Sequence, residues 1–85
     1  MQAEDVFRNA NEQVAARARE LHVGSPIPFL CECSDNRCFR HIALTVEEYD
    51  GASAGSQRYL IIPGHLVGGA SVVGRERRFA LADKS

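Results

Sequence analysis

The three cysteines of the chain, Cys31, Cys33 and Cys38, lie within eight consecutive residues, in the stretch FLCECSDNRC. Thiolates are ligands of zinc and of iron-sulfur clusters, and a zinc ion takes about four ligands from thiolate, imidazole and carboxylate groups. An odd number of clustered cysteines does not fit a disulfide framework and favours metal binding or catalysis. The spacing therefore predicts a metal site that draws three ligands from this segment.

The residues between these cysteines suit a zinc knuckle. In an extended segment, Cys31 and Cys33 point to the same face, because side-chain direction alternates along the chain. Residues 34–37, SDNR, are rich in turn-forming residue types, which can return Cys38 to that face. All three thiols can then meet around one ion.

The fourth ligand remains open when spacing alone is considered. The candidates are the chain's imidazoles and one nearby carboxylate: His22, His41, His65 and Asp35. His41 completes the pattern C-x-C-x4-C-x2-H, but its direction depends on the register of the strand that it opens. His65 ends the turn sequence IIPGH, so its approach to the cysteines would be a tertiary contact. His22 lies where the first predicted helix ends, and there it suits the helix dipole.

Neither acidic residue of the knuckle is predicted to be catalytic. Glu32 and Asp35 are expected to be exposed residues that aid solubility or form the turn. The sequence contains no H-E-x-x-H pattern and no phosphate-binding loop, so we expect a protein without enzymatic activity. A site with four protein ligands has no open coordination position, which is typical of structural zinc.

Charge and composition narrow the class of partner. Ten basic and eleven acidic residues give a formal net charge of −1, without the basic surplus that a phosphate backbone attracts. The most basic spot is RERR, where Arg75, Arg77 and Arg78 form a possible partner-binding turn. The polar, acidic start MQAEDVFRNA does not resemble a signal peptide, so we expect a cytoplasmic protein without a membrane segment.

The surrounding pattern predicts one α+β domain over residues 1–85, with an N-terminal amphipathic helix packed on a small antiparallel sheet. Apolar residues spaced by three and four predict a helix over 4–21, with an apolar stripe formed by Val6, Phe7, Ala10, Val14, Ala18 and Leu21. Residues 28–44 read as a hairpin whose loop holds the cysteines. A capping box at Thr45 and Glu48 begins a second short helix.

The remaining elements are a connection, a strand and a terminal hairpin. The Gly- and Ser-rich residues 51–57 predict a flexible connection. The apolar run over 59–62 predicts a strand that Pro63 and Gly64 end. Residues 72–81 predict a hairpin, with Val72 and Val73 facing Phe79 and Leu81.

Four segments of the chain resemble a widespread group of small uncharacterised bacterial proteins. They are NEQVAARARE, PFLCECSDNRC, LTVEEYD and RYLIIPGH, and the group's patterns are F-[LV]-C-E-C-x4-C, L-T-x-x-E-Y and P-G-H. The likeness covers roughly the whole chain, although the glycine-rich tail departs from it. The resemblance implies a shared fold and His65, rather than His41, as the fourth ligand. It implies no particular activity.

These patterns together predict a small zinc-stabilised module that acts by binding another protein. The ligand set predicted for it is Cys31, Cys33, Cys38 and His65. One alternative is a thiol redox or iron-sulfur protein that holds a [2Fe-2S] cluster on the same ligands. A second alternative is nucleic-acid binding through the Arg75–Arg78 turn, which the charge balance disfavours.

Overall fold

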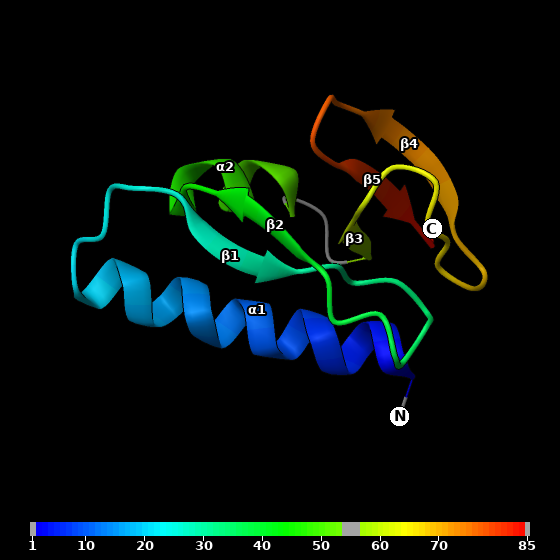
Figure 1. Cartoon of the computed structure of the whole chain (residues 1–85), viewed down its shortest axis with the longest axis horizontal. Helices are drawn as coiled ribbons and strands as arrows, with labels where there is room; N and C mark the ends of the chain where they lie inside the picture. Colours follow the sequence, from blue (N-terminus) through cyan, green and yellow to red (C-terminus); the bar gives the residue numbers. More distant parts are fainter. Residues whose placement is uncertain (1, 54–56, 85) are drawn as a thin grey trace.

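Helix α1 runs beneath a hairpin and a short helix α2, and a three-stranded sheet lies at the knuckle end of α1 (Figure 1). The computed structural model describes residues 2–53 and 57–84. Within them it has the predicted α+β fold. The elements are α1 (Ala3–Glu20), β1 (Ile27–Leu30), β2 (His41–Leu44), α2 (Val46–Ala52), β3 (Arg58–Ile61), β4 (Ser71–Arg75) and β5 (Ala80–Asp83). Among the described residues, neither helix is long and apolar enough to cross a membrane.

The strands divide between two antiparallel sheets. Strands β1 and β2 form the predicted hairpin, with Phe29 opposite Ile42, and residues 31–40 connect them. The second sheet has the order β3-β5-β4, so the predicted terminal hairpin is present as β4 and β5. The pairing differs from the predicted one, because Val72 lies opposite Ala82, and a register shift between Val72 and Gly74 places Gly74 opposite Leu81. The turn follows Arg75.

The buried face of α1 differs from the predicted apolar stripe. Val6, Val14 and Leu21 are between 41% and 59% exposed. The buried positions are Glu4, Phe7, Asn11, Ala15 and Ala18. The spacing of three and four residues was predicted correctly, but the stripe is rotated about the helix axis. The reason is that Glu4 and Asn11 are buried with polar partners from distant segments, which a hydrophobic pattern does not reveal.

Helix α2 begins as predicted. The Thr45 side chain accepts from the backbone N–H of Glu48 (3.1 Å), and the Glu48 carboxylate accepts from the backbone N–H of Thr45 (2.9 Å). This reciprocal capping box satisfies two backbone donors that the first turn leaves free. Of the predicted connection 51–57, Gly51 and Ala52 belong to α2, and 54–56 lie outside the described residues.

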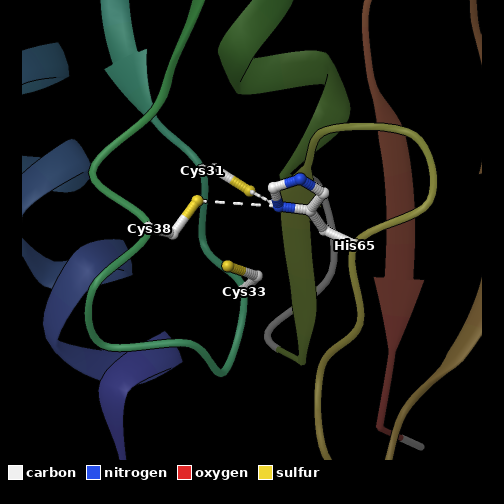
Figure 2. A group of neighbouring side chains, drawn as sticks. All are labelled: Cys31, Cys33, Cys38 and His65. Carbon is white, nitrogen blue, oxygen red and sulfur yellow. Dashed lines mark hydrogen bonds between the residues drawn. The ribbon is translucent and has the colours of Figure 1, made fainter.

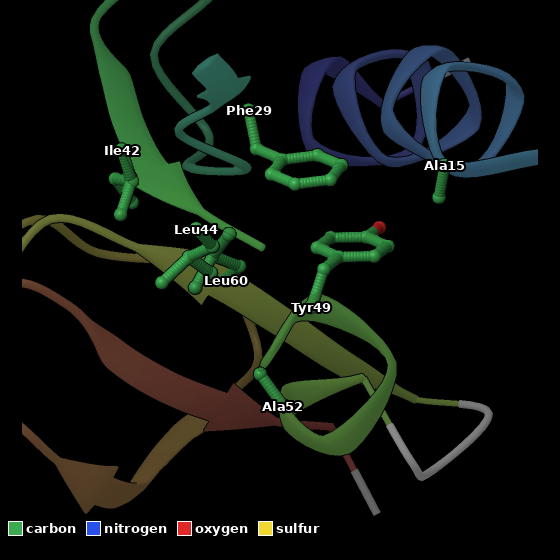
Figure 3. Packing of buried hydrophobic residues seen from close by; sticks show 7 residues of the cluster. All are labelled: Ala15, Phe29, Ile42, Leu44, Tyr49, Ala52 and Leu60. Atoms are coloured by element: carbon green, nitrogen blue, oxygen red, sulfur yellow. The ribbon is translucent and has the colours of Figure 1, made fainter. Parts of the chain in front are cut away.

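A compact apolar cluster lies between the hairpin, α1, α2 and β3 (Figure 3). Its centre is the stacked pair of Phe29 and Tyr49, whose ring centroids are 4.3 Å apart with planes at 7°. Ala15 approaches from α1 and Leu60 from β3. Because β1, α2 and β3 all contribute, this cluster holds the hairpin against the second sheet and so helps to place the cysteine loop.

Candidate metal centre

Cys31, Cys33, Cys38 and His65 converge on one point between the hairpin loop and the turn after β3 (Figure 2). Their ligand atoms, three Sγ atoms and one imidazole nitrogen, all lie within 4.8 Å of one another. Cys31 and Cys33 are buried, while Cys38 and His65 are partly exposed. These four residues form a Cys3His group that can bind a metal ion.

Two of the separations match those between ligands of a single tetrahedral ion. Nδ1 of His65 lies 3.5 Å from Sγ of Cys31 and 3.6 Å from Sγ of Cys38. Metal-ligand distances of about 2.3 Å for sulfur and about 2.0–2.1 Å for nitrogen place tetrahedral ligand atoms roughly 3.5–3.8 Å apart. The donor set and these two separations are compatible with a bound metal ion, and zinc is one ion that uses such ligands.

Backbone hydrogen bonds hold the cysteine loop in the predicted knuckle. The N–H of Cys31 donates to the carbonyl of Arg40 (2.9 Å), which extends the β1–β2 ladder by one bond. The N–H of Cys38 donates to the carbonyl of Asp35 (3.1 Å), closing a four-residue turn. The Asp35 carboxylate accepts from the backbone N–H of Arg37 (2.9 Å), so this residue serves the turn as predicted.

A second turn brings His65 to the cysteines. The N–H of His65 donates to the carbonyl of Ile62 (2.9 Å), and Gly64 between them has a φ of 94°. Pro63 and Gly64 thus occupy the two central positions of a turn of type II, where proline presets the first φ and glycine permits the positive second one. The P-G-H segment therefore positions the imidazole, as the sequence indicated.

The thiols are desolvated and one receives a backbone hydrogen bond. Burial raises the pKa of Cys31 to about 12 and also raises the pKa of Cys33. The N–H of Ile62 donates to Sγ of Cys31 (3.3 Å), and such a bond favours the thiolate. A bound cation also favours thiolates, so metal binding would displace thiol protons.

The other candidate ligands lie outside the cluster. His41 opens β2 with an exposed side chain, opposite Leu30 in the hairpin. His22 is exposed just after α1, where its backbone N–H donates to the carbonyl of Arg19 (3.1 Å). Neither belongs to the group of converging ligand atoms found among the described residues, and neither does Asp35.

Glu32 was predicted to be exposed, and this prediction is wrong. Its exposed fraction is 0%, although it lies between two cysteine ligands. Because side chains alternate, Glu32 points away from the thiols and into the protein. One carboxylate oxygen accepts from Nδ2 of Asn11 (2.7 Å) and the hydroxyl of Tyr49 (2.9 Å), and the other accepts from the backbone N–H of Leu60 (2.8 Å).

Glu32 and its partners Asn11, Tyr49 and Leu60, here called the Glu32 hub, join α1, α2 and β3 to the cysteine segment. The backbone N–H of Glu32 donates to the carbonyl of Leu60 (2.7 Å), and Asn11 exchanges two further bonds of 2.8 Å with the backbone of Leu30. Burial raises the pKa of Glu32, while its three donors favour the carboxylate, which only accepts hydrogen bonds. Burial also raises the pKa of Tyr49, which keeps its hydroxyl a donor.

No sequence pattern predicted this hub, because the three donors to the Glu32 carboxylate lie 17 to 28 residues away in the sequence. A charged residue between two ligands resembles an ordinary surface residue when only the sequence is read. The one available signal was the alternation itself. If Cys31 and Cys33 face the ion, then Glu32 must face the opposite side of the segment, which is the side that packs on the core.

The arginine turn lies away from the metal centre. Arg75 ends β4, and Arg77 and Arg78 lie in the turn before β5, all with exposed side chains. Arg78 donates to the carbonyl of Ala43 (2.9 Å) and to the carboxylate of Glu48 (2.8 Å). Arg78 thus braces the turn against β2 and α2.

Comparison of the chain with family models, with curated proteins and with solved structures finds no match. The resemblance to small bacterial proteins therefore stays a prediction. The case for a function rests on the geometry of the Cys3His group and its surroundings.

Proposed function

We propose that the protein is a small zinc-stabilised module that acts by binding another protein. The proposal rests above all on one observation, which is that four ligand atoms from two distant segments lie within 4.8 Å of one another. With these ligands filled, the ion has no open position and its role is structural. It joins the β1–β2 knuckle to the turn after β3, which the chain otherwise links through the Glu32 hub and apolar packing.

A single zinc ion accounts for the ligand spacing better than a [2Fe-2S] cluster does. A cluster places two ligands on each of two irons, so its four ligand atoms spread over a wider region than those of one ion. The separations of 3.5 and 3.6 Å between His65 and two thiols agree with one shared ion. Zinc also suits a domain of 85 residues, because chains of this size often need a staple beyond their core.

Metal content tests this assignment. The wild-type chain, expressed in zinc-supplemented medium and purified under reducing conditions, should contain about one zinc per chain and show no visible absorbance, by elemental analysis and spectroscopy. The variants Cys33→Ser and His65→Ala should lose most of this zinc, because each removes one of four ligands. His41→Ala is the matched control and should retain it, since His41 is an exposed imidazole outside the group.

Three results would contradict the proposal in whole or in part. A folded, reduced wild-type protein without metal would remove the metal site altogether. Visible absorbance in anaerobically purified protein, with iron in place of zinc, would support the cluster on the same residues. Zinc loss in His41→Ala with retention in His65→Ala would reverse the assignment of the fourth ligand.

A further inference from the structure

Phe39, which directly follows the ligand Cys38, is held at the surface in a conformation that bulky residues rarely adopt. Its φ is 45° and its side chain is 62% exposed. The ring makes a T-shaped contact with the ring of Phe7, with centroids 5.5 Å apart and planes at 75°. Strained backbone of this kind concentrates at binding and switch sites. The exposed ring therefore points to a contact with a partner.

An open groove of about 340 Å³ lies beside this ring, between the first turns of α1 and the knuckle. It is lined by Ala3, Val6, Phe7, Asn36 and Phe39. Val6 is 47% exposed there, and it is one of the apolar residues that the rotated stripe of α1 leaves outside the core. The groove therefore presents apolar side chains from two separate elements, in a concave arrangement that can receive an apolar side chain.

The loop that contributes Asn36 and Phe39 to the groove also carries two basic residues. Arg37 follows Asn36 and Arg40 follows Phe39; both are exposed, and neither guanidinium has an ion-pair or hydrogen-bond partner among residues 2–53 and 57–84. The two acidic residues of the first turn of α1 already bind other residues of the protein. Glu4 accepts from Lys84 (2.8 Å) and Ser34 (3.2 Å), and Asp5 accepts from the hydroxyl of Tyr59 (2.6 Å).

We propose that this groove, here called the Phe39 groove, binds a peptide segment of a partner protein in which acidic residues flank an apolar anchor. The anchor would fill the space between Val6 and Phe39, and the acidic residues would pair with Arg37 and Arg40. Asp35, the exposed acid of the same loop, would disfavour an anion on its own side. This inference rests on the proposed function, because the ion fixes Cys38 and thereby Phe39.

The groove favours a peptide over single-stranded nucleic acid. Nucleic acid would use Phe39 for stacking and the arginines for phosphates, which is a combination known in binding modules for single strands. Such modules surround their aromatic residues with a basic groove, whereas Ala3 and Val6 line this one. The net charge of −1 also opposes a polyanion more than it opposes a short acidic peptide.

Selection from a random peptide library displayed on phage tests the proposal with zinc-loaded full-length protein as the target. We expect the enriched peptides to combine acidic residues with one large apolar residue. The best synthetic peptide should bind Phe39→Ala about tenfold more weakly, as is usual for a central aromatic contact. The double variant Arg37→Glu, Arg40→Glu should bind more weakly still. Val73→Ala, which alters an exposed valine on β4, should bind normally.

Zinc content and far-ultraviolet circular dichroism are measured on every sample, so loss of fold is separated from loss of the groove. Three results would overturn the proposal: no enriched peptide class, enriched peptides that bind Phe39→Ala as well as wild type, or tighter binding of oligo(dT) than of any peptide. Peptide binding that depends on Phe39 in a protein without metal would contradict the zinc assignment and leave the Phe39 groove standing.

Discussion

The two faces of the Cys31–Cys33 segment both connect this segment to the β3 region, but they do so by different interactions. On one face, the three thiols converge with His65 on a point where a cation can bind. On the other face, the carboxylate of Glu32 is fully buried and receives three donors from the protein itself. Both faces tie the segment to the β3 region. Under the proposed function, one tie depends on a bound ion, and the other is made entirely by the chain.

This comparison shows why a short segment can organise an 85-residue fold. Alternation along an extended chain places the thiols and the carboxylate on opposite sides within three residues. The Glu32 side reaches α1, α2 and β3, and the thiol side reaches the turn that contains His65. Removing either connection should therefore loosen the contact between the two sheets. The decrease in the free energy of unfolding then measures how much each connection contributes to stability.

Removal of the ion should have the largest effect. Binding of structural zinc supplies about 10–16 kcal/mol in zinc-finger peptides near neutral pH, which is comparable to the whole stability of a small domain, about 5–15 kcal/mol. Dialysis against a chelator at neutral pH should therefore abolish the cooperative thermal transition that circular dichroism records. Restoring zinc should restore the transition. An unchanged melting curve after verified metal loss would show that the Glu32 face alone supports the fold.

Replacing the buried carboxylate should have a smaller effect. Glu32→Gln turns one acceptor oxygen into a donor group among three donors, and a buried donor left without an acceptor costs about 1–3 kcal/mol. Urea unfolding of the zinc-loaded variant should show a decrease of this order in the free energy of unfolding, with about one zinc still bound. Loss of zinc together with stability would mean that the two faces are not separable.

Removing a single donor to the hub should have the smallest effect. Tyr49→Phe deletes one hydroxyl hydrogen bond to Glu32 and keeps the ring that stacks on Phe29. A typical hydrogen bond contributes about 0.5–1.5 kcal/mol, so a loss near 1 kcal/mol is expected in the same urea experiment. Thr45→Ala, which removes the cap of the helix that holds Tyr49, is a useful reference of similar size, about 1 kcal/mol. A loss for Tyr49→Phe well above that of Glu32→Gln would place the hydroxyl, rather than the carboxylate, at the centre of the hub.

Local spacing predicted much of the fold correctly. The helix over 4–21, the hairpin around the cysteines, the capping box and the terminal hairpin depend on residues close in sequence, and each is present. The inward face of α1 was not predictable in the same way. Glu4 and Asn11 are buried because Lys84, Ser34, Leu30 and Glu32 satisfy their polar groups, and those partners lie 19 to 80 residues away.

The sequence by itself determined the ligand chemistry of the candidate metal site. Three thiols within eight residues, separated by turn formers, cannot avoid one another, and P-G-H specifies a turn through proline and a positive φ at Gly64. Residue spacing left the fourth ligand open and the family resemblance only implied His65, so only the tertiary structure shows that this imidazole lies beside the thiols and that Glu32 is buried. Both outcomes depend on β3, which lies beside the cysteine segment although about thirty residues separate them along the chain. Contacts at that separation are set by packing of the whole core, and no local pattern encodes them.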